Sequence, residues 1–292
     1  QPKTILHIGG QLVSKRLLNF LQKYTPEKYI LINENPNRYD PEHLVTNRIE
    51  ANIQKFCEQL FPHIQIKTNT QWLNKIIDAN KDTSILIEKF KKSGNHISEI
   101  AIAQIISKNV PNASGLFLAS SMPIRDMDMY AGKNINQVTV GSNRGASGID
   151  GTIASAAGFA RGLKSPVTLV IGDIAFIHDL NSLALLSTVN YPLIIILINN
   201  HGSGIFSFLP ISKQKNVFEK YFATPHSINF RHAAKLFEIR YHSPKSTKEF
   251  LEIYNSSLKN QKSTIIEIET NREENYKIHK QLESRIVKVL EN

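Results

Sequence analysis

The chain has 292 residues, of which 41% are hydrophobic and 21% are charged. This composition is typical of a folded protein with one or two domain cores and excludes a disordered chain. The longest aliphatic run, residues 193–198, is too short to span a bilayer, and the first residues lack the pattern of a secretory signal. We therefore expect a soluble intracellular protein without a membrane span.

The formal net charge is +10, from 35 basic and 25 acidic residues. The lysines are scattered through predicted helices and loops, and they do not form a stripe interleaved with aromatic residues. Nucleic acid is therefore not the expected partner. We expect several of the cations to serve anionic small molecules such as diphosphates and carboxylates.

The first third of the chain is predicted to form a parallel α/β unit followed by helices. Strands are expected at residues 4–8 and 28–33, and helices at residues 12–24, 51–64 and 70–92. Gly9 and Gly10 lie at the first turn of this nucleotide-fold-like unit. Two glycines alone are a weak signal of a binding site, because an ordinary tight strand-to-helix turn also uses them. Cys57 lies at helical spacing from neighbouring apolar residues, so we expect a buried and inert thiol.

A turn at residues 93–95 predicts the domain boundary, which gives domains 1–93 and 94–292. The second domain alternates strands with helices, a pattern typical of a doubly wound parallel sheet. Strands are expected at residues 115–119, 137–140, 167–171, 193–198 and 263–269. Helices are expected at residues 97–106, 154–162, 180–189, 230–239, 247–258 and 277–289, the last as a solvated surface helix.

Two of these strands end in polar residues that suit a divalent cation. Gly172 and Asp173 follow the strand at residues 167–171, and Asn199 and Asn200 follow the next. Ligands of open parallel sheets bind beyond the carboxyl ends of the strands. Carboxylate and amide oxygens are hard ligands for Mg²⁺ or Mn²⁺, which also hold phosphates.

This stretch resembles the diphosphate-binding signature of thiamine-diphosphate enzymes, which opens with Gly-Asp-Gly and closes with Asn-Asn. Here Ile174 stands where the third glycine is usual. With the Asn-Asn-His-Gly turn at residues 199–202 and the SNRGASGIDG run at residues 142–151, the chain is similar to one branch. That branch comprises the 2-succinyl-5-enolpyruvyl-6-hydroxy-3-cyclohexene-1-carboxylate synthases of menaquinone and phylloquinone biosynthesis.

The resemblance implies an α/β fold of the thiamine-diphosphate-binding type, preceded by part of a second α/β domain. It also implies a synthase that decarboxylates 2-oxoglutarate and adds the succinyl unit to isochorismate, with thiamine diphosphate and Mg²⁺ or Mn²⁺ as cofactors. The implied metal ligands are Asp173, Asn200 and the Gly202 carbonyl. The implied cofactor contacts are Ile149, Gly172, Asp173, Ile174, Asn200, Gly202, Ile205, Phe206 and Leu209.

The same resemblance assigns the substrate-facing groups Ser121, Arg125, Arg144 and Lys15. Arg125 follows a Ser-Ser-Met run where the family has Asn-Ser-Leu, and a guanidinium pairs well with carboxylates. From the residues alone, Ser121 is equally a helix N-cap and Lys15 a solvated residue near a helix start. Ile149 is equally a core residue.

The family's activating glutamate lies in a pyrimidine-binding domain, of the same or a facing subunit, that no segment here resembles. We therefore expect the carboxyl-terminal part of a homo-oligomeric synthase, a fragment that begins without methionine, in the cytoplasm or a plastid stroma. The alternatives are a diphosphate-binding module without catalysis or another thiamine-diphosphate-dependent 2-oxoacid decarboxylase. A nicotinamide dehydrogenase is disfavoured, because GSGIFS at residues 202–207 lacks the third glycine and the following acidic strand end.

Overall fold

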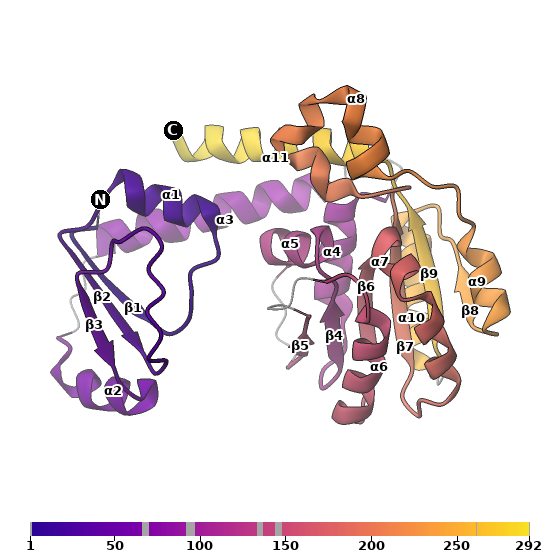
Figure 1. The fold of residues 1–292 in the computed structure, drawn as a ribbon, viewed down its shortest axis with the longest axis horizontal. Coiled ribbons are helices and arrows are strands. Elements are labelled where there is room, and N and C mark those ends of the chain that lie inside the picture. Colours follow the sequence, from indigo (N-terminus) through magenta and orange to yellow (C-terminus); the bar gives the residue numbers. More distant parts are fainter. Residues whose placement is uncertain are drawn as a thin grey trace. The chain divides into compact units, whose positions relative to one another are not determined.

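The computed structural model describes residues 2–65, 70–91, 97–132, 137–143, 148–260 and 262–291. The chain forms two compact units, Gln1–Trp72 and Leu73–Asn292 (Figure 1). The domain boundary predicted between residues 93 and 94 falls outside the described residues, and it stays a prediction. None of the described helices is long and apolar enough to cross a membrane.

The smaller unit is a three-stranded parallel sheet of order β1-β2-β3 with its helices (Figure 1). Its elements are β1 (Thr4–Ile8), α1 (Lys15–Lys23), β2 (Lys28–Asn33), β3 (Asn47–Glu50), α2 (Ile53–Leu60) and the 3₁₀ turn η1 (Phe61–His63). The two predicted strands are confirmed. Helix α1 begins three residues later than predicted because Ser14 caps it, its side chain accepting a hydrogen bond from the Leu17 amide.

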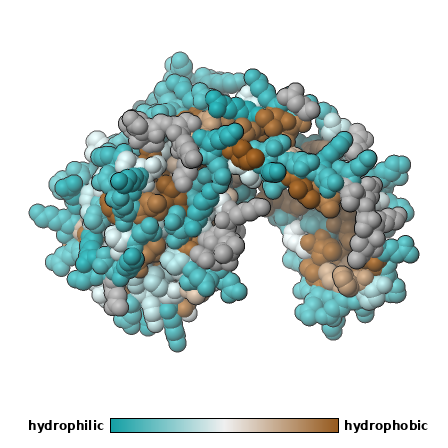
Figure 2. Space-filling model, turned by 180° about the vertical axis from the view of Figure 1, so that it is seen from behind, coloured by the Kyte–Doolittle hydropathy of each residue, from teal (hydrophilic) through white to brown (hydrophobic). Residues whose placement is uncertain are grey.

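The smaller unit leaves apolar side chains exposed. Leu6, Ile8 and Ile49 share one face of its sheet and are 40–46% exposed. Figure 2 shows hydrophobic side chains at the surface of this unit. The prediction that Cys57 is buried is wrong, because α2 is short and turns this residue to the exposed side.

The larger unit is built on a six-stranded parallel sheet of order β5-β4-β6-β7-β9-β8. Its strands are β4 (Gly115–Leu118), β5 (Thr139–Gly141), β6 (Val167–Gly172), β7 (Leu193–Asn199), β8 (Arg240–His242) and β9 (Thr264–Glu269). Its α-helices are α4 (Glu99–Asn109), α5 (Met122–Tyr130), α6 (Thr152–Leu163), α7 (Asp173–His178), α8 (Lys215–Phe218), α9 (Phe230–Leu236), α10 (Thr247–Lys259) and α11 (Arg272–Glu291), while α3 (Thr70–Lys91) runs across the division between units. Shorter turns are η2 (Leu180–Ser187), η3 (Gly204–Phe208), η4 (Pro210–Lys213) and η5 (Glu219–Ala223).

Both faces of this sheet are buried, which confirms the doubly wound fold. The side chains of β7 alternate: Ile194, Ile196 and Ile198 pack into one core, and Leu193, Ile195 and Leu197 pack into the other. Residues of α4, α5, α10 and α11 complete the first core, and residues of α6, α7 and α9 complete the second. Figure 1 shows helices on both sides of the strands. Strands buried on both faces read as continuous apolar runs, which is why β6 and β7 were predictable.

Two helices differ from their predictions. The helix expected at residues 180–189 is the 3₁₀ segment η2, where the Ser187 and Thr188 hydroxyls donate to backbone carbonyls three residues earlier and compete with α-helical bonding. The last helix, α11, is not only a solvated surface helix. Its His279 and Leu282 are buried, and Leu282 packs into the first of the two cores, although lysines and glutamates surround both residues in the sequence.

The strand order places the topological switch point between β4 and β6. From β4 the chain continues to β5 on one side, and it then returns to β6 on the other side before reaching β7. Ligands of open α/β sheets bind in the crevice outside the strand ends at such a point. The segments after β4, β6 and β7 therefore form the place to examine for a functional site.

Candidate functional site

A cavity of about 440 Å³ lies at this switch point. The segments that follow β4, β6 and β7 all contribute to its wall, together with the start of α4. Its lining residues include Glu99, Ser120, Ser121, Met122, Pro123, Arg125, Gly148, Ile149, Gly172, Asp173, Ile174, Asn200, Gly202, Ile205 and Phe206. Of the strand-end residues singled out from the sequence, Gly172, Asp173 and Asn200 thus share one cavity, whereas Asn199 lines a different one.

Asp173 is a buried carboxylate at the first turn of α7. Its Oδ1 accepts a hydrogen bond of 2.7 Å from the Ile174 amide, and its Oδ2 accepts one of 2.9 Å from the Gly202 amide. Burial raises the pKa of Asp173, although the two amide hydrogen bonds act in the opposite direction. A carboxylate in this setting would gain from a cation, because its charge is poorly solvated.

Asn200 supplies a second oxygen to the same cavity. Its Nδ2 donates to Glu99 Oε1 at 3.1 Å, while its buried Oδ1 has no hydrogen-bond partner among the described residues. A buried amide oxygen without a partner is costly unless a ligand completes it. Within the described ranges, no three His, Cys, Asp or Glu side chains form a group that could hold a metal ion by themselves. The Asp173, Asn200 and Gly202 set fits a hard divalent ion.

Gly202 is held in a backbone conformation that favours glycine. Its φ is 147°, and a Cβ placed on it would lie 2.4 Å from the Ala223 carbonyl oxygen. In this turn the Gly202 amide also donates to Asp173 Oδ2. The glycine is therefore required by the turn itself, whatever binds beside it.

Ser121 and Arg125 lie at the edge of the cavity on the start of α5. Ser121 is the N-cap residue, but its side chain makes no capping hydrogen bond, and its φ of 79° is unusual for a residue other than glycine. The Arg125 Nη1 donates to the Ser121 carbonyl at 2.5 Å. The strained backbone leaves the Ser121 hydroxyl uncommitted to capping, a feature typical of functional sites.

Of the remaining predicted cofactor contacts, all but Leu209 line the cavity. Gly172, Ile174, Ile205 and Phe206 line the cavity. Ile149 lines it and also packs against the second core, so both interpretations of this residue stand. Leu209 is 46% exposed and is not among the lining residues.

Two backbone amides at the start of α6 are already bonded within the protein. The Asp179 Oδ2 accepts hydrogen bonds from the Ile153 amide at 2.5 Å and from the Ala154 amide at 3.1 Å. This carboxylate caps the helix from another part of the chain, so the two amides are not available to an anion. This cap could not be predicted from local pattern, because 25 positions separate Asp179 from Ala154.

The structure does not test two of the predicted substrate-facing residues. Arg144 lies outside the described residues. Lys15 belongs to the smaller unit, where it is exposed at the first position of α1. Their roles stay predictions.

Sequence reasoning missed Glu99 and His226. Glu99 is 1% exposed and its Oε2 has no partner among the described residues; burial raises its pKa to about 7, and the charge of Asp126 adds to the rise. The Nε2 of His226 lies 3.1 Å from Asp173 Oδ2. In the sequence, Glu99 resembles an ordinary first-turn acidic residue of a helix, and nothing ties either residue to the strand ends.

A buried acid–base pair lies close to Glu99. His279 of α11 contacts Asp126 of α5 at 2.8 Å through Nε2, and its Nδ1 lies 2.8 Å from the Asn275 carbonyl. Burial alone would lower the pKa of His279, but the hydrogen bond and charge of Asp126 outweigh it, so the pKa is raised. The pair joins α11 to the helix that carries Arg125.

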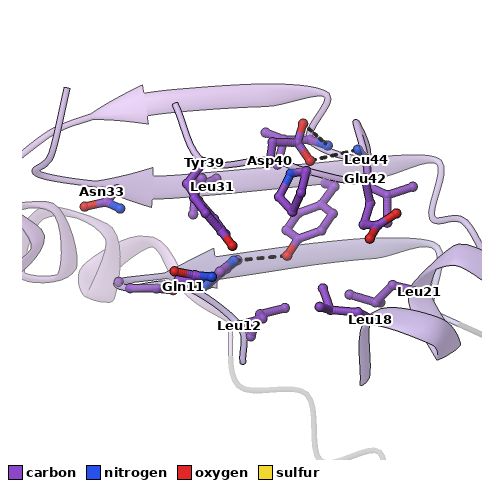
Figure 3. Close-up of a pocket in the computed structure, with 16 residues that line it drawn as sticks. Gln11, Leu12, Leu18, Leu21, Leu31, Asn33, Tyr39, Asp40, Glu42 and Leu44 are labelled. Atoms are coloured by element: carbon purple, nitrogen blue, oxygen red, sulfur yellow. Dashed lines mark hydrogen bonds between the residues drawn. The ribbon is translucent and has the colours of Figure 1, made fainter. Parts of the chain in front are cut away.

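The smaller unit has a cavity of its own, of about 50 Å³. Figure 3 shows Gln11, Asn33 and Tyr39 around it, with the Asp40 carboxylate turned to the backbone near Leu44. Asp40 accepts hydrogen bonds from the Leu44 amide at 3.0 Å and the Val45 amide at 3.2 Å. Its carboxylate therefore holds the loop together.

Two thiamine pyrophosphate families match consecutive parts of the chain. The family described as "Middle domain of thiamine pyrophosphate" matches residues 1–118. The family described as "Thiamine pyrophosphate enzyme, C-terminal TPP binding domain" matches residues 127–268. The second match contains both Asp173 and Asn200.

Curated relatives named 2-succinyl-5-enolpyruvyl-6-hydroxy-3-cyclohexene-1-carboxylate synthase match nearly the whole chain. The protein of Prosthecochloris aestuarii is 44% identical over 97% of this chain and 48% of its own length. The protein of Chlorobium phaeobacteroides is 43% identical over 99% of this chain and 50% of its own length. The protein of Rubrobacter xylanophilus is 40% identical over 96% of this chain and 49% of its own length. The chain spans about half the length of the curated relatives it matches.

A solved structure shares the fold. The thiamine diphosphate-dependent 4-hydroxybenzoylformate decarboxylase of Rhodococcus jostii RHA1 superposes with a TM-score of 0.65 at 17% sequence identity. The match covers 92% of this chain and 49% of that chain. At this identity the likeness concerns the fold alone.

Proposed function

We propose a function from one premise: the chain belongs to the thiamine pyrophosphate enzymes, as a relative of their 2-succinyl-5-enolpyruvyl-6-hydroxy-3-cyclohexene-1-carboxylate synthases. The chain is the carboxyl-terminal part of such a synthase and takes part in menaquinone or phylloquinone biosynthesis. The whole enzyme decarboxylates 2-oxoglutarate and adds the succinyl unit to isochorismate. The observation that carries this proposal is the cavity at the switch point, which is lined by both Asp173 and Asn200 and where the Asn200 Oδ1 has no partner among the described residues.

In this proposal the cavity holds thiamine diphosphate through Mg²⁺ or Mn²⁺. Asp173, the Asn200 Oδ1 and the Gly202 carbonyl would hold the ion, and the ion would hold the diphosphate. The raised pKa of Asp173 supports this arrangement, because a divalent cation would stabilise the buried carboxylate in its charged form. The glycines of the turn let the backbone approach the diphosphate.

When bound, thiamine diphosphate supplies the carbanion chemistry that decarboxylation needs. The residues of this chain bind and orient the reactants. Arg125 would neutralise a substrate carboxylate at the rim, with Ser121 beside it as a hydrogen-bonding group. Ile149, Ile205 and Phe206 would form the apolar wall that excludes water.

We further infer that the site is completed by protein outside this chain's two units. The activating glutamate would come from a pyrimidine-binding domain of the same or a facing subunit, in a homo-oligomer. The support is that the matched relatives are about twice as long as the chain. A cytoplasmic or plastid location stays a prediction.

Titration calorimetry with thiamine diphosphate and Mg²⁺ tests the cofactor proposal. We expect the chain to bind the cofactor only when the cation is present. Asp173→Ala should weaken this binding by about 100-fold or more, about 2.7 kcal/mol, because it removes the charged ligand. The exposed Asp128→Ala should bind like the unchanged chain. Absent binding by the folded chain, or unchanged affinity in Asp173→Ala, would contradict the proposal.

A second measurement separates catalysis from mere binding. The chain is mixed with the amino-terminal half of a matching synthase, and release of carbon dioxide from 2-oxoglutarate is followed. We expect release with 2-oxoglutarate and product formation only with isochorismate present. Cofactor binding without release would favour a diphosphate-binding module, and release from other 2-oxoacids alone would favour another decarboxylase.

A further inference from the structure

Three elements bring polar side chains together behind the cavity. Glu99 comes from the first turn of α4, Asn200 from the end of β7, and Thr270 from the end of β9. The Thr270 amide also donates to the Asn199 carbonyl at 2.9 Å, which ties the two strand ends together. Glu99 is held in place by the capping of α4, where the Ser98 hydroxyl accepts from the Ala101 amide at 3.1 Å.

The Oε1 of Glu99 accepts two hydrogen bonds. The Asn200 Nδ2 and the Thr270 Oγ1 each lie 3.1 Å from it. Nδ2 of an amide can only donate, and a carbonyl oxygen of a carboxyl group can only accept. Oε1 therefore fixes which end of the Asn200 amide points toward Glu99, whether or not Oε2 carries a proton.

The opposite end of the amide is then defined. The Asn200 Oδ1 is buried in the cavity wall without a hydrogen-bond partner among the described residues. The amide is also confined by Gly204, where an added Cβ would come within 2.8 Å of Nδ2. The amide nitrogen occupies the space that a side chain at this position would need.

We propose that Glu99 is a positioning residue of the cation site: by accepting from the Asn200 Nδ2, it presents the Asn200 oxygen, and not the nitrogen, to a divalent cation. The inference rests on the proposed function, because it assumes that Asn200 is a ligand. Glu99 acts through the amide and does not itself touch the ion. A flipped amide would turn its NH₂ group toward the cation and lose the ligand.

Mn²⁺ binding in the presence of thiamine diphosphate tests the proposal, with free Mn²⁺ measured by electron paramagnetic resonance. Glu99→Met removes the acceptor and should weaken Mn²⁺ binding about 10- to 100-fold, as is usual for groups that orient metal ligands. Glu99→Gln keeps an oxygen that can accept from Nδ2, so its affinity should stay within a few-fold of the unchanged chain. Equal losses in both variants would mean that the charge of Glu99 matters, and would overturn the proposal.

A double variant tests whether Glu99 acts through the orientation of the Asn200 amide. Asn200→Asp places an oxygen at both ends of the side chain, so orientation no longer decides whether a ligand faces the cation. Adding Glu99→Met to Asn200→Asp should therefore cause no further loss of Mn²⁺ affinity. If Glu99→Met causes the same 10- to 100-fold loss with asparagine and with aspartate at position 200, the proposal is overturned. Glu99 would then affect the cation independently of the amide orientation.

The outcomes separate this inference from the proposed function. A folded, unchanged chain that binds no Mn²⁺ with thiamine diphosphate contradicts the proposed function. An unchanged chain that binds Mn²⁺, with Glu99→Met binding equally well, contradicts the positioning role alone. Circular dichroism of each variant confirms that the larger unit is folded before its affinity is compared.

Discussion

The smaller and the larger unit each have a parallel sheet with a glycine turn after a strand, and each turn borders a cavity. After β1, the ring of His7 lies between the Gly10 carbonyl, at 2.7 Å from Nε2, and the Tyr29 hydroxyl, at 3.0 Å from Nδ1. A carbonyl can only accept, so Nε2 donates to it, and both ring nitrogens have a partner within the smaller unit. After β7, by contrast, the buried Oδ1 of Asn200 has no partner among the described residues, and neither has Oε2 of Glu99 at the start of α4.

The two cavities also differ in volume and in how their carboxyl groups are bonded. The one beside β1 measures about 50 Å³, and one of the carboxylates that line it, Asp40, accepts two amide hydrogen bonds from its own loop. The one at the switch point measures about 440 Å³ and contains carboxyl groups whose pKa values burial raises. The same strand-turn-helix pattern thus serves either a self-contained loop or a ligand site. Unsatisfied buried oxygens around an open space distinguish the second.

The largest expected effect contrasts two histidines, one from each unit. His279→Ala leaves the buried Asp126 carboxylate without its partner and should lower the free energy of unfolding of the larger unit by about 4 kcal/mol. His7→Ala removes two hydrogen bonds at a half-buried position and should cost the smaller unit about 1 kcal/mol. Hydrogen exchange of peptides from each unit measures both effects. Equal losses in the two units would contradict the expected difference between a buried acid–base pair and a half-buried ring that is bonded within its own unit.

The second prediction concerns pH and Glu99, in the absence of added cation. The pKa of Glu99 is raised from 4.5 to about 7, so the folded chain holds its proton more tightly than the unfolded chain does. The stability from this group is complete below pH 4.5 and is lost as the pH rises through about 7, by about 3 kcal/mol in total. Urea unfolding of the larger unit at pH 5 and pH 8 measures the loss.

Glu99→Gln is the matched control for this pH dependence, because a glutamine stays neutral throughout. Its stability should change less between the two pH values than that of the unchanged chain. Identical pH dependence in both proteins would show that Glu99 does not titrate in this range. The smaller unit should show no change with the substitution at either pH.

The sequence predicted those parts of the fold and site that depend on neighbouring residues. The apolar runs of β6 and β7 identified the central strands, and Asp173 and Asn200 follow them directly. Contacts between distant segments could not be predicted. Glu99 is 101 positions from Asn200, and 153 positions separate Asp126 from His279.

The errors have the same physical origin. The charged residues around His279 suggested a solvated helix, but one stripe of α11 packs into the core. The apolar neighbours of Cys57 suggested burial, but α2 of the smaller unit has no fully buried residue. The spacing of apolar residues along the sequence predicts which face of a helix is apolar. Whether that face is buried depends on the elements that pack against it.

The smallest expected effect contrasts the glycines of the two turns. At Gly202, with φ of 147°, an alanine Cβ would lie 2.4 Å from the Ala223 carbonyl oxygen, so Gly202→Ala must move the backbone. At Gly9, with φ of 102°, an added Cβ would meet no atom within 4 Å. We expect Gly202→Ala to cost about 2 kcal/mol, from strain and overpacking together, and Gly9→Ala about 1 kcal/mol from strain alone.

The two alanine variants should also differ in cofactor affinity. Because the Gly202 amide donates to Asp173, moving this backbone disturbs the proposed cation site, and Gly202→Ala should weaken Mg²⁺-dependent binding of thiamine diphosphate. Gly9→Ala changes a turn of the smaller unit in which the Gly10 carbonyl already accepts from His7, so affinity at the cavity of the larger unit should stay the same. Urea unfolding and titration calorimetry separate the two effects. A variant of Gly9 that lost cofactor affinity would mean that the smaller unit's turn contributes to the site after all.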